Sequence, residues 1–584
     1  MPAKASEEIK ARTIRQTQKN GDIYVIERRT RYDPAKKYNV VLSSRLVGKI
    51  PKGKDAVVPT RPKRGRQEKV SNSQPSSANV SAMRKKIGMM DIIDHIGNAS
   101  GIDAAIYGAT DRGTAQKIIS LARYLLGTNG QSLPGIATWQ YTHPLPYEEG
   151  LSEDIYHDLF EKVGRDESLM QSFFSARLAD LGDTALLAYD STTISTYSKR
   201  IPEARYGFNK AQDGLETVKL LSLYSISTRQ PVAFAKQPGN QPDVITLENA
   251  LKQLQGLGIA KAEIVTDNGY CSEKNLAELL HAHFDFITLI KTSIRWVRQE
   301  LDQRLDDFRS TGSACPFDTN THGITVMRMQ EFSRERKYAN RKKGLSCGDT
   351  ESFQRRIYLH LYFNPLRRAE QDAAFDKDIF ELKRLIEEGV PEEALSEGAV
   401  NKASKYLIVR RYGTKITVTF NEKAIADRKK YHGYFALVSN CERDAFECLG
   451  KYRRRETIES FFESGKQKAD GARTRVWSSE CLMGRMFVQF VALCYYEYFS
   501  EQIRGMKREI GSDLSTPAQC TAESLKRSKK LLTWLKNTPV YLTLQWFDVV
   551  EEVKVSTKLL SKRWSTEITD RDRLFLEKLG VPSF

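Results

Sequence analysis

Closely spaced cysteines are what this sequence most clearly lacks. Its eight cysteines are scattered along 584 residues, and none belongs to a Cys-x2-Cys pair. This distribution argues against a disulfide framework and against a cysteine-ligated zinc site. We therefore interpret the cysteines as buried or idle thiols of a protein in a reducing compartment.

Long hydrophobic stretches are also missing. The longest apolar run, MFVQFVALCYYEYF at residues 486–499, contains a Gln and a Glu. It is shorter than the roughly 20 residues that a membrane span needs, so we predict a buried helix. The first residues, MPAKASEEIKAR, have no apolar core and predict no signal peptide. We therefore expect a cytoplasmic protein with no membrane partner.

Acidic residues are too few to balance the basic ones. Lys and Arg number 91 against 73 Asp and Glu, which leaves a formal net charge of +18. An excess of this size indicates a polyanionic partner, with DNA or RNA as the first candidates. The alternative is a protein that is merely basic. A nucleic-acid partner would place the protein on the nucleoid.

Composition divides the first part of the chain into three regions. Residues 1–58 contain two β-rich stretches separated by PAKK and predict a small β-hairpin module. Residues 59–82 read as a linker, first basic and broken by proline, then rich in serine. Residues 83–181 carry helix caps and apolar residues at helical spacing, which predicts a helical region. Because the chain as a whole is basic, we expect this region to bind DNA.

The basic run PTRPKRGRQEK in the linker has two interpretations. It is either a solvated tether or an arm that follows DNA phosphates, and composition does not choose between them. The residues of such an arm would be Arg61, Lys63, Arg64 and Arg66.

From residue 182 strands and helices alternate. Residues 182–291 read as three strands, a helix, a strand, a helix and a strand, which predicts a mixed α/β sheet. Residues 292–446 mix further helices and strands and predict an insertion domain. Residues 447–510 contain two further helices, and residues 511–584 are predicted to form a mostly helical tail.

Two aspartates follow apolar strands of the predicted sheet. Asp190 in LLAYDSTT and Asp267 in EIVTDNGY are each expected at a strand end, where ligand sites of α/β sheets occur. Two carboxylates on adjacent strand ends would share a hard cation such as Mg²⁺. The alternative is that each aspartate only caps a turn.

The stretch KYRRRETIESFFESGKQKADG, residues 451–471, places two phenylalanines inside a dense run of charges. On one helix of about 3.6 residues per turn, four polar side chains lie within about 60° of one another. They are Tyr452, Arg455, Glu459 and Lys466, and the neighbouring face holds Ile458, Phe461 and Phe462. A carboxylate beside these groups suits a metal-bound phosphate. Spacing does not separate Glu459 from Glu456 and Glu463, and a salt-bridged surface helix is the alternative.

These four residues resemble a family signature. Tyr452, Arg455, Glu459 and Lys466 match the Tyr-x2-Arg-x3-Glu-x6-Lys pattern of bacterial insertion-sequence transposases of the IS-four superfamily. The resemblance covers residues 180–480 well and singles out Glu459 from its neighbours.

The two aspartates look like the first acids of the family's Asp-Asp-Glu triad. The resemblance implies an α/β fold with a ribonuclease H-like mixed sheet flanked by helices. A β-rich insertion domain would interrupt it, between an N-terminal helical region and a helical C-terminal tail. Asp190, Asp267 and Glu459 would hold two Mg²⁺ ions, for which Mn²⁺ could substitute.

The activity that the resemblance implies is cut-and-paste DNA transposition. The protein would act as a homodimer on paired ends of its own element, with double-stranded DNA as both donor and target. Tyr452, Arg455 and Lys466 would grip phosphates beside the cleaved bond. Trp296 would stack on a flipped base, with a core position as its alternative.

Two other functions remain open. One is a DNA-binding descendant that has lost the chemistry, which the retention of all three carboxylates disfavours. The other is a stand-alone metal-dependent nuclease of the same fold, from which only a strand-transfer product would distinguish a transposase.

Overall fold

The computed structural model describes residues 9–33, 38–58, 81–179, 186–256, 261–337, 339, 346–412, 415–468, 471, 473–515, 521–556 and 561–582. The chain forms two units, Met1–Asn79 and Val80–Phe584. The arm residues Arg61, Lys63, Arg64 and Arg66 lie outside the described residues.

The first unit contains a three-stranded antiparallel sheet in the order β1-β2-β3. Its strands are β1 (Lys10–Thr17), β2 (Ile23–Asp33) and β3 (Tyr38–Ile50). β2 and β3 fall in the two β-rich stretches of the sequence, and β1 adds a strand that was not anticipated. Val25 and Ile50 are the buried hydrophobic side chains among the described residues of this unit.

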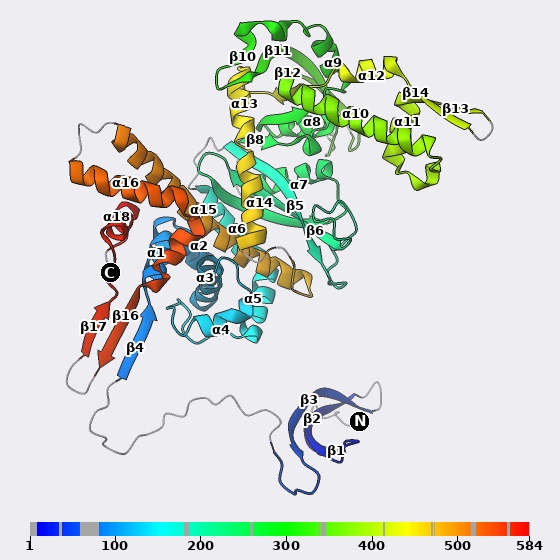
Figure 1. The fold of residues 1–584 in the computed structure, drawn as a ribbon. Coiled ribbons are helices and arrows are strands. Elements are labelled where there is room, and N and C mark those ends of the chain that lie inside the picture. The colour runs from blue at the N-terminus through cyan, green and yellow to red at the C-terminus, as the bar shows by residue number, and fades with distance from the viewer. Residues whose placement is uncertain are drawn as a thin grey trace. The chain divides into compact units, whose positions relative to one another are not determined.

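The second unit begins with a strand and a layer of helices (Figure 1). These elements are β4 (Ser81–Lys86), α1 (Gly88–Ala99), α2 (Ile102–Ala109), α3 (Arg112–Gly127), α4 (Ile136–Trp139), α5 (Glu153–Arg165) and α6 (Glu167–Ala179). Asp111 caps α3 by accepting a hydrogen bond from the Thr114 backbone, as the capping pattern of the sequence predicts. The layer packs on α15 (Ser479–Ser515), which contains the apolar run 486–499 as the expected buried helix.

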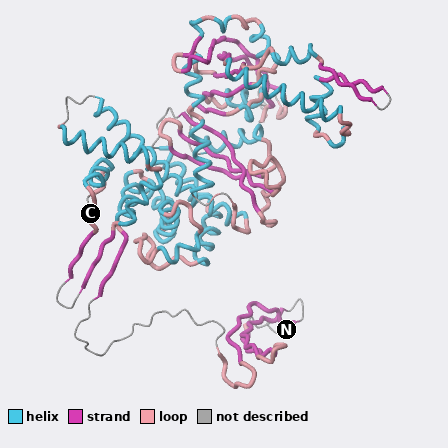
Figure 2. The backbone as a smooth tube through the Cα atoms, viewed as in Figure 1, coloured by secondary structure: helices cyan, strands magenta, loops and turns pink. Residues whose placement is uncertain are grey.

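A nine-stranded mixed sheet forms the centre of the second unit (Figure 2). Its order is β10-β11-β12-β15-β9-β8-β5-β6-β7. The five strands expected between residues 182 and 291 are all present: β5 (Leu186–Thr196), β6 (Glu216–Ser225), β7 (Gln230–Pro238), β8 (Glu263–Thr266) and β9 (Asp285–Ile290). β5, β6 and β7 are antiparallel, whereas β8 runs parallel to both β5 and β9. Helices α7 (Asp243–Gly256) and α8 (Glu273–His281) flank β8 in sequence, as the pattern predicts.

The same sheet continues into residues 292–446. β10 (Ala314–Cys315), β11 (Asp318–Glu335), β12 (Thr350–Phe363) and β15 (Tyr434–Ser439) extend it, because β15 pairs with β9. The rest of this region comprises α9 (Arg295–Asp302), α10 (Pro365–Glu387), α11 (Glu397–Tyr406), α12 (Glu422–Lys429) and the hairpin β13 (Leu407–Tyr412) with β14 (Lys415–Phe420). This part has a small hydrophobic cluster of its own around Ile379 and Tyr406.

The C-terminal region is less helical than the sequence predicts. Helices α16 (Ala522–Asn537), α17 (Val540–Gln545) and α18 (Asp570–Leu579) are joined by the strands β16 (Glu551–Ser556) and β17 (Ser561–Ser565). β16 lies between β17 and β4 in an antiparallel sheet. The alternating residues EEVKVS suit a strand that has a partner, and that partner comes from the distant residues 81–86.

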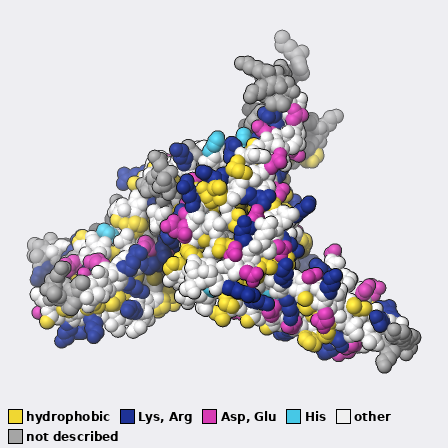
Figure 3. Space-filling model, turned by 90° about the horizontal axis from the view of Figure 1, so that it is seen from above, with side chains coloured by type: hydrophobic (Ala, Val, Ile, Leu, Met, Phe, Trp, Pro, Cys, Tyr) yellow, Lys and Arg dark blue, Asp and Glu magenta, His cyan; other side chains and the backbone are white. Residues whose placement is uncertain are grey.

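Charge is distributed over the surface. On the face seen in Figure 3, Lys and Arg side chains are spread among acidic and hydrophobic ones. No helix of the described residues is long and apolar enough to cross a membrane.

Asp91 makes the stability of the second unit depend on pH. Burial raises the pKa of this carboxyl to about 6, and the charges of Asp94 and Glu552 add to the effect. The folded state therefore binds the proton more tightly than the unfolded chain, and stability is lost as pH rises towards and through 6. We expect Asp91→Asn to raise the melting temperature by about 2 °C at pH 7.5 and by only about half as much at pH 5, because pH 5 lies midway between the unfolded pKa of 3.8 and the folded pKa of about 6.

A matched control is Asp154→Asn, because Asp154 occupies the exposed first turn of α5 as Asp91 occupies the first turn of α1. It should shift the melting temperature equally at both pH values. The same gain for Asp91→Asn at pH 5 and 7.5, measured by differential scanning fluorimetry, would contradict the assignment.

Candidate active site

Asp190 lies in the middle of β5, not at its end as predicted. β5 extends to Thr196 because the β-branched residues after Asp190 continue the pairing with β6. β8, on the other side of β5, ends at Thr266, and Ala188 is paired with Val265. Asp190 is thus level with the first residue beyond β8. From this point on, no strand of the described residues pairs with β5 on the β8 side.

That first residue is Asp267. Its Oδ1 accepts hydrogen bonds from the backbone N–H of Asn268 (2.7 Å) and from the Tyr452 hydroxyl (3.1 Å). It caps the short 3-10 turn Asn268–Tyr270, so the turn-cap interpretation and the ligand interpretation both describe its position. The side chain of Asp267 is 44% exposed, against 13% for Asp190.

The charged stretch after residue 450 is two helices instead of the single predicted one. α13 (Ala445–Arg453) ends and α14 (Glu456–Lys468) begins around a turn at Arg454 and Arg455. The turn is closed by the Arg455 N–H, which donates to the Tyr452 carbonyl oxygen at 2.9 Å. Ile458, Phe461 and Phe462 are buried, as expected for the face that anchors α14.

The turn between α13 and α14 directs the Arg455 side chain towards the carboxylates. Its guanidinium donates from Nη1 to Asp190 Oδ2 and from Nη2 to Glu459 Oε1, both at 2.9 Å. Nη2 is also 3.8 Å from Asp267 Oδ2. One cation, itself only 9% exposed, therefore links the three carboxylates of the predicted triad.

Burial sets the electrostatics of these groups. It raises the pKa of Asp190, and the Arg455 charge offsets only part of that rise. Burial lowers the pKa of Arg455, but the charges around it, Asp190 first, reverse the shift and leave that pKa raised. Burial, followed by the Asp267 charge, also raises the pKa of Tyr452. Tyr452 therefore stays a neutral hydrogen-bond donor at physiological pH.

The donor set fits a hard cation. Among the described residues, no group of three or more His, Cys, Asp or Glu side chains is arranged to hold a metal ion as it stands. The three carboxylates instead surround the positive charge of the Arg455 guanidinium. Their oxygen atoms are the kind of ligand that Mg²⁺ prefers. Arg455 would have to release them for such an ion to bind.

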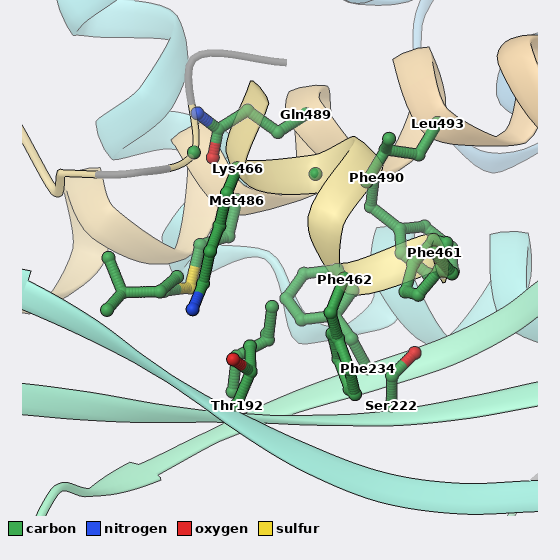
Figure 4. Close-up of a pocket in the computed structure, with 14 residues that line it drawn as sticks. Thr192, Ser222, Phe234, Phe461, Phe462, Lys466, Met486, Gln489, Phe490 and Leu493 are labelled. Atoms are coloured by element: carbon green, nitrogen blue, oxygen red, sulfur yellow. The ribbon is translucent and has the colours of Figure 1, made fainter. Parts of the chain in front are cut away.

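Lys466 does not reach the three carboxylates. It lines a small neighbouring pocket of about 40 Å³ with Thr192, Phe461 and Phe462 (Figure 4). Burial lowers its pKa, and the charge of Lys210 lowers it further. Trp296 is 7% exposed, with the Arg328 guanidinium 5.4 Å from its ring centre, which corresponds to the core alternative.

The pocket that holds the carboxylates contains residues that sequence reasoning missed. It has a volume of about 330 Å³, and its lining includes Phe208, Lys210, Lys219 and Asp243 besides Asp190, Asp267 and Glu459. Lys219 donates to Asp243 Oδ1 at 2.7 Å, and the Ser191 hydroxyl donates to the same atom at 2.9 Å. Asp243 follows Pro242 at the start of α7. No spacing in the sequence connects Lys219 or Asp243 with Asp190.

Comparisons with known proteins place the chain in a family. Residues 182–495, more than half of the chain, match a family model described as "Transposase DDE domain". A solved structure entitled "Cryo-EM structure of piggyBac transposase synaptic complex with hairpin DNA (SNHP)" is similar at 9% sequence identity and a TM-score of 0.34, over 79% of this chain and 78% of that one. No curated protein matches the chain. The family match shows that the chain belongs to the transposases with a DDE domain.

Proposed function

We propose that the chain is a DNA transposase of the IS-four superfamily that cleaves the ends of its own element and joins the 3′-hydroxyls to target DNA. The observation that carries the proposal is the convergence of Asp190, Asp267 and Glu459 on one guanidinium. The five strands β7-β6-β5-β8-β9, with Asp190 in β5 and Asp267 directly after the adjacent β8, support a ribonuclease H-like class for the catalytic part.

In this proposal Asp190, Asp267 and Glu459 would hold two Mg²⁺ ions, which when bound would supply activation of the attacking oxygen and stabilisation of the leaving one. Asp190 is positioned by the pairing of β5 with β6, and Asp267 is oriented by the Asn268 N–H and the Tyr452 hydroxyl. Arg455, once released from the carboxylates, is placed to donate to a phosphate oxygen, as its planar fork favours. Lys466 would contact a phosphate of the DNA backbone from the neighbouring pocket.

The remaining parts of the proposal concern DNA and assembly. The helical region 83–181 and the arm with Arg61, Lys63, Arg64 and Arg66 would bind element ends, and two copies would pair those ends. The net charge of +18 supports DNA as partner and a nucleoid location. The alternatives are an inactive DNA-binding descendant and a stand-alone nuclease.

The test is cleavage of a labelled DNA fragment that spans the flanks of the gene, with Mg²⁺ or Mn²⁺. Wild type should make discrete cuts at both flanks, and Glu459→Ala should abolish them, because a metal ligand is lost. Glu463→Ala is the matched control, since Glu463 is exposed one turn further along α14. Equal cleavage by Glu459→Ala would remove Glu459 from the mechanism. Binding without cutting would favour the inactive descendant, and cuts without joined product would favour the nuclease.

A further inference from the structure

Four of the most exposed aromatic side chains of the second unit lie on two chain segments beside the catalytic pocket. Tyr197, Tyr206 and Phe208 are 71%, 73% and 77% exposed on the connection between β5 and β6. Trp477 is 66% exposed on the segment that leads into α15. Large aromatic rings bury much area when they find a partner, so such exposure in one region indicates a binding surface.

The two segments are tied into one surface. Ser195 and Arg473 form a parallel β-bridge, and the hydroxyls of Thr196 and Thr474 are 2.7 Å apart. Further along, the Ser479 hydroxyl donates to Glu203 at 2.6 Å. The connection after β5 and the segment before α15 therefore run side by side, and we call their exposed rings the aromatic platform: Tyr197, Tyr206, Phe208 and Trp477.

The platform is continuous with the site. Phe208 and Lys210 line the same pocket as Asp190, Asp267 and Glu459. Lys210 is held towards that pocket, because its backbone N–H donates to Thr193 Oγ1 and its ammonium to the Ser191 carbonyl oxygen, both at 3.3 Å. The loop that carries it is fixed by Asn209, which donates to Asp213 at 2.7 Å.

The charge of these segments favours a polyanion. Residues 197–215 and 473–478 contain six Lys or Arg and two acids. Both acids are already paired, Glu203 with Lys236 and Asp213 with Arg473. Aromatic rings interleaved with cations are typical of surfaces that bind single-stranded nucleic acid, since every base has a face to stack and every nucleotide a phosphate.

We propose that the aromatic platform binds unpaired bases of the DNA strand that leaves the catalytic pocket, with the rings stacking on bases and the cations contacting phosphates. The proposal rests on the proposed function, since it takes the strand in the pocket to be DNA. The platform would be a second DNA-binding site, separate from the signature residues. By holding unpaired bases, it would stabilise the separated strands beside the cleaved bond.

The experiment compares two DNA probes on the full chain with EDTA present, so that no cleavage occurs. One probe is a blunt duplex, and the other is the same duplex with a short single-stranded thymidine extension. We expect the extension to raise the affinity of wild type by at least about tenfold. Tyr206→Ala/Phe208→Ala should lose most of that gain, and its affinity for the blunt duplex should stay within about twofold.

The controls separate stacking from a general loss of fold. Tyr141 and Trp564 are exposed elsewhere in the second unit, so Tyr141→Ala/Trp564→Ala should keep the gain. Tyr206→Trp/Phe208→Trp should keep it as well, because the rings are retained. A 2-aminopurine in the extension should lose fluorescence on binding to wild type and not on binding to the double alanine variant.

Two results would overturn the proposal: no gain from the extension with wild type, or a full gain with the alanine variant. In the second case, a change of Tyr206→Ala/Phe208→Ala from dimer to monomer would assign the surface to contact with a second copy. The gain is independent of cleavage. If the extension raises the affinity but flank DNA is not cut, the platform proposal stands and the proposed function fails. If flank DNA is cut but the extension does not raise the affinity, only the platform proposal fails.

Discussion

Asp190→Asn is expected to lower the rate of DNA cleavage by at least about a thousandfold. Asp190 is the most buried of the three carboxylates, and the amide would keep its shape but lose the charge that a cation needs. Binding of DNA should not weaken, because a negative charge is removed from a surface that meets phosphates. Single-turnover cleavage and a gel-shift titration measure the two effects on one preparation.

A thiolate makes this test specific for a metal ligand. Asp190→Cys should be as inactive as the asparagine variant with Mg²⁺ and regain part of its activity with Mn²⁺, which accepts sulfur more readily. Glu463→Cys should cleave like wild type with both ions. Wild-type cleavage by Asp190→Asn with Mg²⁺ would show that this carboxylate takes no part in the reaction.

Gly484→Ala is expected to destabilise the second unit severely. A Cβ at this position of α15 would come well inside 3.0 Å of the Phe160 carbonyl oxygen in α5. Gly164 of α5 meets the Glu480 carbonyl oxygen of α15 in the same way. Because both obstacles are backbone, the helices would have to separate, at a cost of about 3 kcal/mol or more for either substitution. We expect a melting temperature lower by at least about 5 °C, or loss of soluble protein.

The same helix supplies the control. Gly505 also lies in α15, and nothing stands within 4 Å of a Cβ built there. Gly505→Ala should leave the melting temperature unchanged or raise it by about 1–2 °C, since alanine favours the helix. Thermal unfolding of the three alanine variants side by side decides the matter. Equal melting temperatures for Gly484→Ala and Gly505→Ala would mean that α5 and α15 do not approach so closely.

The residues that the structure brings together around Arg455 could be singled out in the sequence because their signals are local. Asp267 ends an apolar strand, and the helical spacing from Arg455 to Glu459 survives in the structure, since an i,i+4 pair needs only one turn. The spacing from Tyr452 to Lys466 does not, because the chain turns at Arg454 and Arg455 and places Lys466 in another pocket. A periodicity count assumes one unbroken helix and has no way to register such a turn.

The pairing of strands that are far apart in the chain could not be predicted from the sequence. The strands of residues 182–291 were recognisable, but β15 joins β9 through hydrogen bonds that no local pattern encodes, and so extends the sheet to nine strands. The contact of Lys219 with Asp243 and the approach of Phe208 to the pocket also depend on tertiary packing. Propensity describes single segments, whereas these contacts are decided by which segments meet.

The close packing of α5 on α15 has a consequence for synthesis of the protein. Residues 153–165 leave the ribosome long before residues 479–515, and at ~5–20 residues per second the delay is on the order of tens of seconds. Until then the apolar faces of α3 and α5 that α15 covers stay exposed, and β4 must wait still longer for β16. The helical layer is thus completed only near the end of translation, and until then these apolar faces are open to aggregation.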